Sequence, residues 1–334
     1  MGKISAYAKL LRLPGIGALG IPPVIAALTM GIYDFFDLTI VFIIGALSCI
    51  FGFLLNDYVD VEVDKLVEDL RKKPLVSGEI SRKSALIISI ILILVTFFFI
   101  SLLYKGEQFG QYKFFAVTSI IIAGCLGSIY NIYGKKIIGS DLLVAISVAF
   151  VFLFGALSYG QPNVATWIIF FLTFNNILYM NAIQGGLKDA DHDYKMKVKN
   201  IALKSGLEVS GGNIYVPFSF KILGMTIRIV SAILLFLPFI LFNYNYYLWQ
   251  ITLLIVLTSL VLIISFKFLN LKKFDRNKIR RIIGFQSFLR YSLVPIMLMS
   301  IIDIKYSVIL IIVPILWYII FTNLVSEELF KPRM

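Results

Sequence analysis

Acidic and amide side chains recur at helical spacing directly after an apolar run that covers residues 38–55. The first acidic group consists of Asn56, Asp57, Asp60 and Asp64. If one helix continues through it, Asn56, Asp60 and Asp64 share a face, with Asp57 beside them. Carboxylate and amide oxygens are the ligands that Mg²⁺ prefers, and acids beside a membrane-length run indicate a functional site. The spacing therefore predicts a Mg²⁺ site, against the alternative of a solvated helix end.

A second acidic group follows another apolar run, 164–183, and contains Asp189, Asp191 and Asp193. On a continuous helix Asp189 and Asp193 share one face, whereas Asp191 points away from it. A helix break at the glycine pair 185–186 would instead allow all three carboxylates to converge. Both arrangements remain open. We predict that the two acidic groups together bind about two Mg²⁺ ions.

Three consecutive basic residues, Arg71, Lys72 and Lys73, lie in the loop after the first acidic group. As a lid over a bound diphosphate, they would complete an anion site that the metal begins. Alternatively, the loop only determines topology, and Ser81 caps the following helix. The nearby acidic group favours the lid. Arg12, ahead of the first apolar run, is either an interface anchor or a phosphate ligand.

Composition and the order of apolar runs indicate a polytopic membrane protein. Of the 334 residues, 59% are hydrophobic and only 15% are charged, which a water-soluble fold would not tolerate easily. We therefore predict an all-α bundle of membrane helices that forms a single domain over residues 1–334. Ten runs are long enough to span a bilayer, at about 14–32, 38–56, 84–104, 114–133, 142–160, 164–183, 222–242, 247–268, 283–301 and 305–324.

The distribution of positive charge predicts the orientation of these runs. With ten crossings, 26 of the 31 Lys and Arg residues lie on one side of the membrane. The positive-inside rule assigns this side, both termini and both acidic groups to the cytoplasm. The net charge of +12 is thus explained by topology, and no nucleic acid partner is expected. Arg228 and Arg290 lie inside runs, where a charge is unusual and Arg228 is expected to have a partner.

Three stretches match motifs of a known family in order, over roughly residues 12–221. The stretch 56–64 fits NDxxDxxxD, the first motif of the UbiA superfamily, at every defined position. The stretch 73–81 is similar to the family's R-P-L-x-x-G-x-I-S loop, with Lys73 in place of Arg. The stretch 130–135 is similar to its Tyr/Lys segment after the fourth helix. The chain therefore resembles the UbiA intramembrane prenyltransferases.

Two departures from the family pattern stand out. The second motif usually reads D-x-x-D-x-x-x-D, and here Gly186 takes the place of the first acid, while Asp189 and Asp193 match the other two. Either Asp191 or Gln184 is a candidate to replace the missing acid. The family usually has nine membrane helices, so residues 302–334 are expected to form an additional tenth helix and a tail.

The resemblance implies a helical bundle in the cell membrane around a central cavity, closed on the cytoplasmic side by polar loops. It also implies Mg²⁺-dependent transfer of an isoprenyl chain from a polyprenyl diphosphate to a hydrophobic acceptor within membrane lipid. An aromatic quinone precursor and an archaeal-type glycerol phosphate ether lipid are both compatible acceptors. Tyr130, Lys135 and Lys188 are the candidate catalytic residues. Charge-assisted hydrogen bonds to the diphosphate are expected from Arg12, Arg71, Lys73, Tyr130, Lys135 and Lys188.

A cation-coupled transporter is the alternative function, because acids inside membranes also mark ion paths. It predicts acids near the bilayer midplane and two related halves of the sequence. Here the acids lie at the ends of apolar runs beside basic loops, and no repeat is visible. His192 is the only histidine, which excludes metal sites of several histidines and Ser-His-Asp triads. These features favour the transferase.

Overall fold

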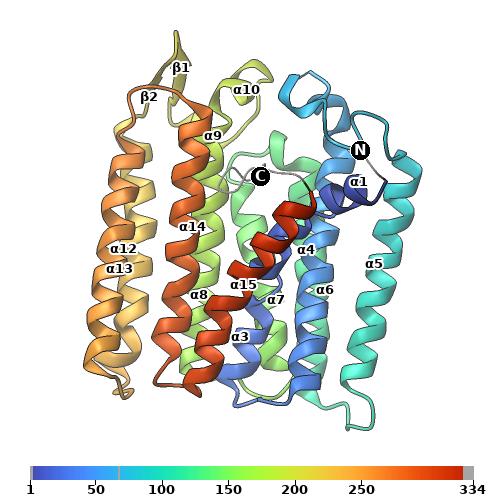
Figure 1. Ribbon diagram of the computed structural model, residues 1–334, viewed down its shortest axis with the longest axis vertical. Coiled ribbons are helices and arrows are strands. Elements are labelled where there is room, and N and C mark those ends of the chain that lie inside the picture. Colours follow the sequence, from blue (N-terminus) through green and yellow to red (C-terminus); the bar gives the residue numbers. More distant parts are fainter. Residues whose placement is uncertain (1–2, 67, 326–334) are drawn as a thin grey trace. The chain divides into compact units, whose positions relative to one another are not determined.

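The structure, a computed structural model, describes residues 3–66 and 68–325 and consists almost entirely of helices (Figure 1). The predicted all-α fold class is confirmed. The chain divides into two compact units, each built from separate stretches of sequence. Among the described residues, the first unit contains 3–132 except 67, 147–166 and 313–325, and the second contains 133–146 and 167–312.

Helix α4 is the central element of the first unit and packs against α2, α3 and α5. The unit also contains α6 and parts of α7, α8 and α15, which are shared with the second unit. The elements are α1 (Lys3–Leu10), α2 (Leu13–Leu19), α3 (Pro22–Thr29), α4 (Phe35–Asp64), η1 (Glu68–Leu70), α5 (Arg82–Leu103), α6 (Gln111–Tyr133), α7 (Asp141–Leu157), α8 (Val164–Leu178) and α15 (Ile304–Leu324).

Proline and short polar side chains set the helix starts of the first unit. Pro14 lies in the first turn of α2, where its missing N–H is not needed. The predicted first run is not one helix, because it ends at Gly20 and α3 restarts with prolines in its first turn. Ser81 accepts a hydrogen bond from the backbone N–H of Ser84 and caps α5, which confirms its predicted role.

Residues of α15 lie against the N-terminal helices within the first unit. The indole Nε1 of Trp317 donates to the carbonyl of Leu13 at 2.7 Å. Its side chain also packs directly over Gly17, where a Cβ atom would collide with the indole group. Trp317 stacks on Phe321 and makes an edge contact with Phe42 on α4. This part of α15 is therefore fixed to α2 and α4 by packing and by a hydrogen bond.

In the second unit α12, α13 and α14 pack side by side, with α12 and α14 also against the helical stretch that follows α8 (Figure 1). Its core includes Tyr179, Phe220 and Phe268, which are completely buried. The remaining elements of this unit are η2 (Gly134–Lys136), η3 (Tyr179–Gly185), α9 (Gly186–Lys188), α10 (Ala190–Lys195), α11 (Ile201–Lys204), β1 (Glu208–Ser210), β2 (Asn213–Tyr215), α12 (Phe218–Leu241), α13 (Leu248–Leu269) and α14 (Arg276–Leu298).

A small hairpin interrupts the long connection before α12. Strands β1 and β2 pair antiparallel, and Gly211 and Gly212 form the turn with φ of 56° and 77°. Two-residue hairpin turns require such positive φ values, which glycine adopts without strain. The hairpin is bonded to the connection between α13 and α14, since Ile214 N donates to Lys272 O and Phe274 N to Gly212 O. The two connections are therefore joined through their backbones.

Eight helical stretches among the described residues are long and apolar enough to cross a membrane. The other two predicted runs are also helical. Helix α7 has only 17 residues, and α14 begins with a charged turn that contains Arg276, Lys278, Arg280 and Arg281. All ten predicted runs thus correspond to helices. The prediction of an integral membrane protein is confirmed.

Candidate active site

The first acidic group lies on the last turns of α4, which continues as one helix to Asp64. Continuation of the helix confirms the spacing argument for one shared face. Asp57, Asp60 and Asp64 are each less than a tenth exposed, whereas Asn56 is half-buried. Buried carboxylates require positively charged or hydrogen-bonding partners.

Lys73 supplies such a partner from the loop that follows α4. Its Nζ lies 2.9 Å from Oδ1 of Asp57 and 2.7 Å from Oδ2 of Asp64, so a single ammonium group bridges two carboxylates. Burial disfavours the charged form of Lys73, but the negative charges of Asp57 and Asp64 outweigh it and raise the pKa of Lys73. Lys73 is therefore a fixed cation against the first acidic group.

The backbone of the loop is ordered by its own turns and by two apolar anchors. Leu75 and Ile80 are 5% and 4% exposed and pack into the core around α4 and α5. Ile80 N donates to Pro74 O at 3.1 Å, which closes the turn. Gly78 has φ of 81°, a conformation that favours glycine. Pro74 and Gly78 thus both contribute to the shape of this turn.

Arg12 and Arg71, both predicted to bind diphosphate, differ in position. Arg12 Nη2 lies 2.9 Å from Oδ1 of Asp57, and its guanidinium group lies over the ring of Phe53. Arg12 therefore reaches the first acidic group. Arg71 is exposed, and its Nε donates to the carbonyl of Lys65 at 3.0 Å. Its side chain is thus turned to the end of α4.

The helix that carries the second acidic group changes character twice. After α8, the segment η3 is a π-helix, which contains an extra residue per turn, and the helix then breaks at Asp189 between α9 and α10. Of the two arrangements left open, a continuous helix and a break at the glycine pair 185–186, neither occurs, because the helix continues through the glycines and is interrupted at Asp189. As a result, the three carboxylates have separate partners. Lys188 Nζ lies 3.3 Å from Asp189, and Asn200 donates to Asp193 at 2.7 Å.

Arg276 is the partner of Asp191 and was not predicted as a site residue. Its Nη2 forms a short ion pair with Asp191 Oδ1, and its Nε donates to the carbonyl of Lys188 at 3.3 Å. The same guanidinium group also contacts the ring of His192. In the sequence Arg276 is one of the 26 basic residues that the positive-inside rule assigns to the cytoplasmic side. Its only local signal is Asp275, whose side chain caps α14 and so places Arg276 in the first turn.

Asp193 and His192 have shifted pKa values for different reasons. Burial, followed by the charge of Asp189, raises the pKa of Asp193 to about 7, although Lys135 and Lys188 act in the opposite direction. Burial, followed by the charge of Arg276, lowers the pKa of His192. The positive charges of Lys135 and Lys188 therefore partly offset the effect of burial on Asp193.

The position of the missing acid, Gly186, has no room for a side chain. A Cβ atom there would lie 2.6 Å from the Cβ of Ala202 on α11. The candidate replacement Gln184 is 1% exposed, and its amide donates to Gln286 at 2.7 Å and accepts from Arg290 at 3.3 Å. Gln184 is thus bonded to α14. Asp191 remains the candidate carboxylate at this end of the helix.

Tyr130 and Lys135 lie at the end of α6 and in η2, respectively. Tyr130 is half-buried, and the neighbouring Asn131 donates to the carbonyl of Gly52 on α4 at 3.0 Å, which joins α6 to α4. The carbonyl of Lys135 accepts from Lys199 N at 2.9 Å. Contacts with distant segments therefore hold the backbone at or next to both residues.

The donor set of the first acidic group fits a hard dication. It contains three buried carboxylates and an amide on one helix, with no thiolate or imidazole, and such oxygen ligands suit Mg²⁺. In the described part of the chain, no three His, Cys, Asp or Glu side chains are gathered closely enough to hold a metal as they stand. Lys73 and Arg12 neutralise these carboxylates in the structure. The metal assignment stays a prediction.

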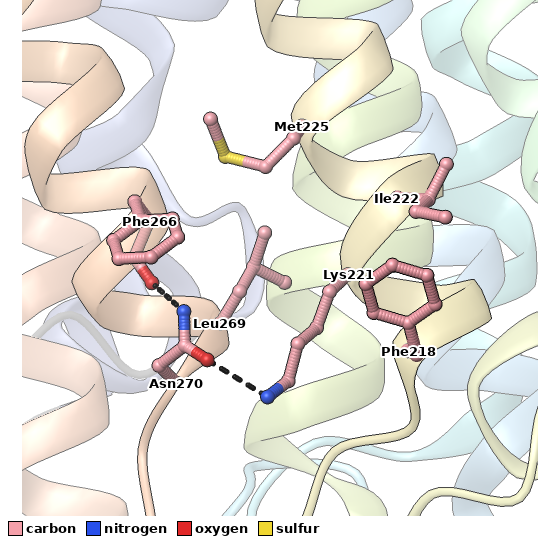
Figure 2. A pocket seen from close by; sticks show the side chains of 7 residues that line it. All are labelled: Phe218, Lys221, Ile222, Met225, Phe266, Leu269 and Asn270. Atoms are coloured by element: carbon pink, nitrogen blue, oxygen red, sulfur yellow. Dashed lines mark hydrogen bonds between the residues drawn. The ribbon is translucent and has the colours of Figure 1, made fainter.

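A groove with mostly apolar walls lies between α12 and α13 in the second unit, with a volume of about 260 Å³ (Figure 2). Its polar groups bond to each other, since Lys221 Nζ lies 2.7 Å from Asn270 Oδ1 and Asn270 donates to Phe266 O. The groove contains none of the predicted site residues. Its lining residues are Phe218, Lys221, Ile222, Met225, Phe266, Leu269 and Asn270.

Comparison with known families identifies the chain. The model of the UbiA prenyltransferase family matches residues 20–293, which include both acidic groups and the intervening loops. The chain belongs to the UbiA prenyltransferase family. The predicted enzyme class, a membrane prenyltransferase, is thereby confirmed, and the transporter alternative is disfavoured. Helix α15 lies beyond the matched region, in agreement with an additional C-terminal helix.

Curated relatives fall into two groups of UbiA enzymes. Digeranylgeranylglyceryl phosphate synthase from Methanococcus vannielii is 29% identical over 61% of this chain and 69% of its own length. The 4-hydroxybenzoate octaprenyltransferase from Shewanella sp. strain W3-18-1 is 30% identical over 61% of this chain and 70% of its own length. The two enzyme names differ in the acceptor, whereas the sequence identity and the coverage are nearly equal for the two relatives.

Solved structures share the fold. A structure of digeranylgeranylglyceryl phosphate synthase has a TM-score of 0.65 and 20% identity, and covers 91% of this chain and 100% of its own. A UbiA homologue from Archaeoglobus fulgidus, bound to GPP and Mg²⁺, has a TM-score of 0.60 and 18% identity over 89% of this chain and 99% of its own. At these identities the similarity establishes a UbiA-type fold.

Proposed function

We propose that this UbiA-family enzyme transfers an isoprenyl chain from a polyprenyl diphosphate to a hydrophobic acceptor in the membrane and releases diphosphate. The acceptor is either an aromatic quinone precursor or a glycerol phosphate ether lipid, as in the two groups of relatives. One observation carries the proposal: Lys73 and Arg12 lie against buried carboxylates of the family motif. Such a combination of acids and bases is what a metal-bound diphosphate requires.

Mg²⁺ is the proposed cofactor, and about two ions are expected. The Archaeoglobus fulgidus homologue is described with GPP and Mg²⁺. In this chain Asn56, Asp57, Asp60 and Asp64 would hold one ion, and Asp189 and Asp193, with Asp191 as a further candidate, would hold the other. When bound, Mg²⁺ would neutralise the diphosphate and so improve it as a leaving group.

The residues of this chain would act on the diphosphate through charge. Lys73 and Arg12 would exchange part of their contact with Asp57 for contact with diphosphate oxygens. Lys188, Lys135 and Tyr130 are proposed to donate hydrogen bonds as the bond between C1 and the diphosphate oxygen breaks and its electron pair moves to oxygen. The acceptor then forms the new bond to C1 and loses its proton. Arg71, which faces the end of α4, is proposed as a secondary contact.

We also propose that the reaction occurs at the cytoplasmic side. The positive-inside rule supports this orientation, because 26 of the 31 Lys and Arg residues fall on the side of the termini and the acidic groups. Accessibility labelling of single cysteines introduced at Ser77 and at Gln108, in loops predicted on opposite sides, tests the orientation. Labelling of Ser77→Cys from the outside of intact cells would contradict it.

The experiment that tests the function is direct. Purified protein in lipid is incubated with labelled geranylgeranyl diphosphate, Mg²⁺ and either 4-hydroxybenzoate or a glycerol phosphate that carries one isoprenyl ether. We expect a Mg²⁺-dependent product whose mass equals the acceptor plus the prenyl group, with release of diphosphate. Asp64→Ala, which is expected to abolish transfer, serves as the inactive control. Absence of any prenylated product with both acceptors, and with donors of other chain lengths, would argue against the proposal.

A further inference from the structure

Two arginines are buried among the membrane helices of the second unit. Arg228 on α12 is 4% exposed and Arg290 on α14 is 5% exposed. Helices α12 and α14 pack against each other, and α12 also packs against the π-helical segment η3. Two like charges in a membrane interior are costly unless an anion lies between or beside them.

Neither arginine has an acidic partner among residues 3–66 and 68–325. Arg228 instead lies over the ring of Tyr179, with its Cζ 3.4 Å from the ring centroid. Its Nε and Nη2 atoms are buried without a hydrogen-bond partner, and so is the hydroxyl of Tyr179. Buried donors are normally bonded, so three such groups on two adjacent side chains require an explanation.

Arg290 is held in place by neutral groups only. Its Nη1 donates to Asn176 Oδ1 at 2.5 Å, and its Nη2 donates to Gln184 at 3.3 Å and to Ser287 at 3.0 Å. A chain of amide and hydroxyl groups continues beyond Gln184, because Gln184 donates to Gln286, which donates to Ser265 at 2.9 Å. These bonds fix the guanidinium group but do not neutralise it. The arrangement is that of a preorganised cationic site.

The position of the site relative to the second acidic group suggests its ligand. Asn176, Tyr179 and Gln184 precede Lys188 on the same helical stretch, so the site lies farther into the membrane than Lys188 and Asp189. The diphosphate is expected at the acidic groups, where metal and lysines are available. An oxyanion farther into the membrane must belong to a molecule that is soluble in lipid.

We propose that Arg228 and Arg290, with the hydroxyl of Tyr179, bind an oxyanion, a carboxylate or a phosphate, that is carried by the prenyl acceptor. This inference rests on the proposed function only in naming the acceptor as the carrier. It predicts an acidic acceptor and excludes a neutral alcohol or quinol as the preferred one. Each good contact between an arginine and an oxyanion is charge-assisted and therefore stronger than a neutral hydrogen bond.

Binding is measured first, without turnover. The purified protein in neutral-lipid nanodiscs is titrated with four probes: a glycerol phosphate bearing one isoprenyl ether, its dephosphorylated alcohol, 4-hydroxybenzoate and inorganic phosphate. Tm and Kd are recorded for each probe. We expect one of the two organic acids to raise Tm and the neutral alcohol to have no effect. The proposal is overturned if the alcohol binds as well as its phosphate and 4-hydroxybenzoate does not bind. It is also overturned if inorganic phosphate is the only probe that binds tightly.

Variants then locate the site. Arg228→Gln and Arg290→Gln should each weaken binding of the acidic probe by at least tenfold, and Arg228→Lys should weaken it less. Arg281→Gln, which removes an exposed charge from the same helix as Arg290, is the matched control and should bind like the wild type. Should the charge variants fail to fold, Tyr179→Phe keeps both charges and should still lower affinity severalfold. Wild-type affinity in Arg228→Gln and Arg290→Gln, or in Tyr179→Phe as the substitute, overturns the proposal.

Kinetics separate this inference from the function itself. In the Arg variants we expect the KM for the acceptor to rise at least tenfold, while the KM for the prenyl diphosphate stays within twofold. Unchanged acceptor KM in active variants overturns the anion site and leaves the transferase intact. Arginine-dependent binding of the acid in a protein that prenylates neither acceptor supports the anion site and contradicts the proposed function.

Discussion

The ammonium nitrogen of Lys73 lies 2.7 Å from Oδ2 of Asp64, the last residue of α4. The loop after α4 therefore folds back onto the helix that it leaves and returns a positive charge to the acids. Asp64 is buried and Lys73 is only about a quarter exposed, so the pair is shielded more than a surface salt bridge. A diphosphate bound there would compete with Asp64 for the same ammonium group.

Replacement of Lys73 by alanine should abolish most of the activity. If Lys73 binds the departing diphosphate in a site that excludes water, its loss should cost about 2–4 kcal/mol of transition-state stabilisation, or roughly 10²–10³ in rate. Lys83→Ala, an exposed residue on α5 beyond the loop, is the control. Initial rates under saturating Mg²⁺ provide the measurement. Equal and small losses in both variants would mean that the loop is only a cytoplasmic connector.

Replacement of the buried acids should change the response to metal. Asp60→Asn and Asp64→Asn should each raise the Mg²⁺ concentration for half-maximal rate by about 10–100-fold or abolish the rate. Mutation of a group that supports a metal site typically lowers metal affinity or activity by this factor. Glu62→Gln removes an acid from the same helix that is 65% exposed and bonded to Lys65 and Arg82. It should behave like the wild type. An unchanged Mg²⁺ requirement in both Asp variants would refute the metal assignment.

The role of Asp191 can be separated from that of Arg276 by a double-mutant cycle. If Asp191 only pairs with Arg276, then Asp191→Asn, Arg276→Gln and the double variant should have similar rates, because one interaction is removed in each case. If Asp191 binds metal, Asp191→Asn alone should raise the Mg²⁺ requirement, and Arg276→Gln should not. Mg²⁺ titration of the three variants distinguishes the two roles. The second acidic group is not a metal site if Asp189→Asn and Asp193→Asn also leave the requirement unchanged.

Restoring the family's usual acid at position 186 should destabilise the protein. In Gly186→Asp the new Cβ would collide with the Cβ of Ala202, which lies 2.6 Å from its ideal position. Overpacking of this kind typically costs about 1–3 kcal/mol. The unfolding temperature should fall, and Ala202→Gly in the same chain should recover part of the loss. A Gly186→Asp variant as stable as the wild type would show that α11 can move away without cost.

Several features were predictable because they depend on local patterns. Membrane-length apolar runs have few alternatives to helix, since every backbone group must be bonded inside the bilayer. The acids at 56–64 keep one α-helical period, so their common face follows from spacing alone. The turn around Pro74 and Gly78 and the cap at Ser81 follow from residue types with strong conformational preferences.

Other features depend on tertiary contacts or on departures from the α-helical period. The π-helical segment η3 displaces Asp189 and the residues after it, so positions counted at four-residue intervals from α8 no longer share a face. Arg276 reaches Asp191 because the connection before α14 is bonded to the hairpin, a pairing between distant segments. The reason for glycine at position 186 is likewise a neighbour, Ala202, that lies on another helix.

Trp317 gives α15 a significance that its distance from the motifs does not suggest. The space over Gly17 is filled by an indole that lies beyond residue 293, where the family match ends, and the same indole donates the hydrogen bond to the carbonyl of Leu13. Leu13 follows Arg12, the residue that contacts Asp57. A protein that ended at residue 293, where the family match ends, would thus keep Arg12 and both acidic groups and yet lose the hydrogen bond to Leu13, the neighbour of Arg12.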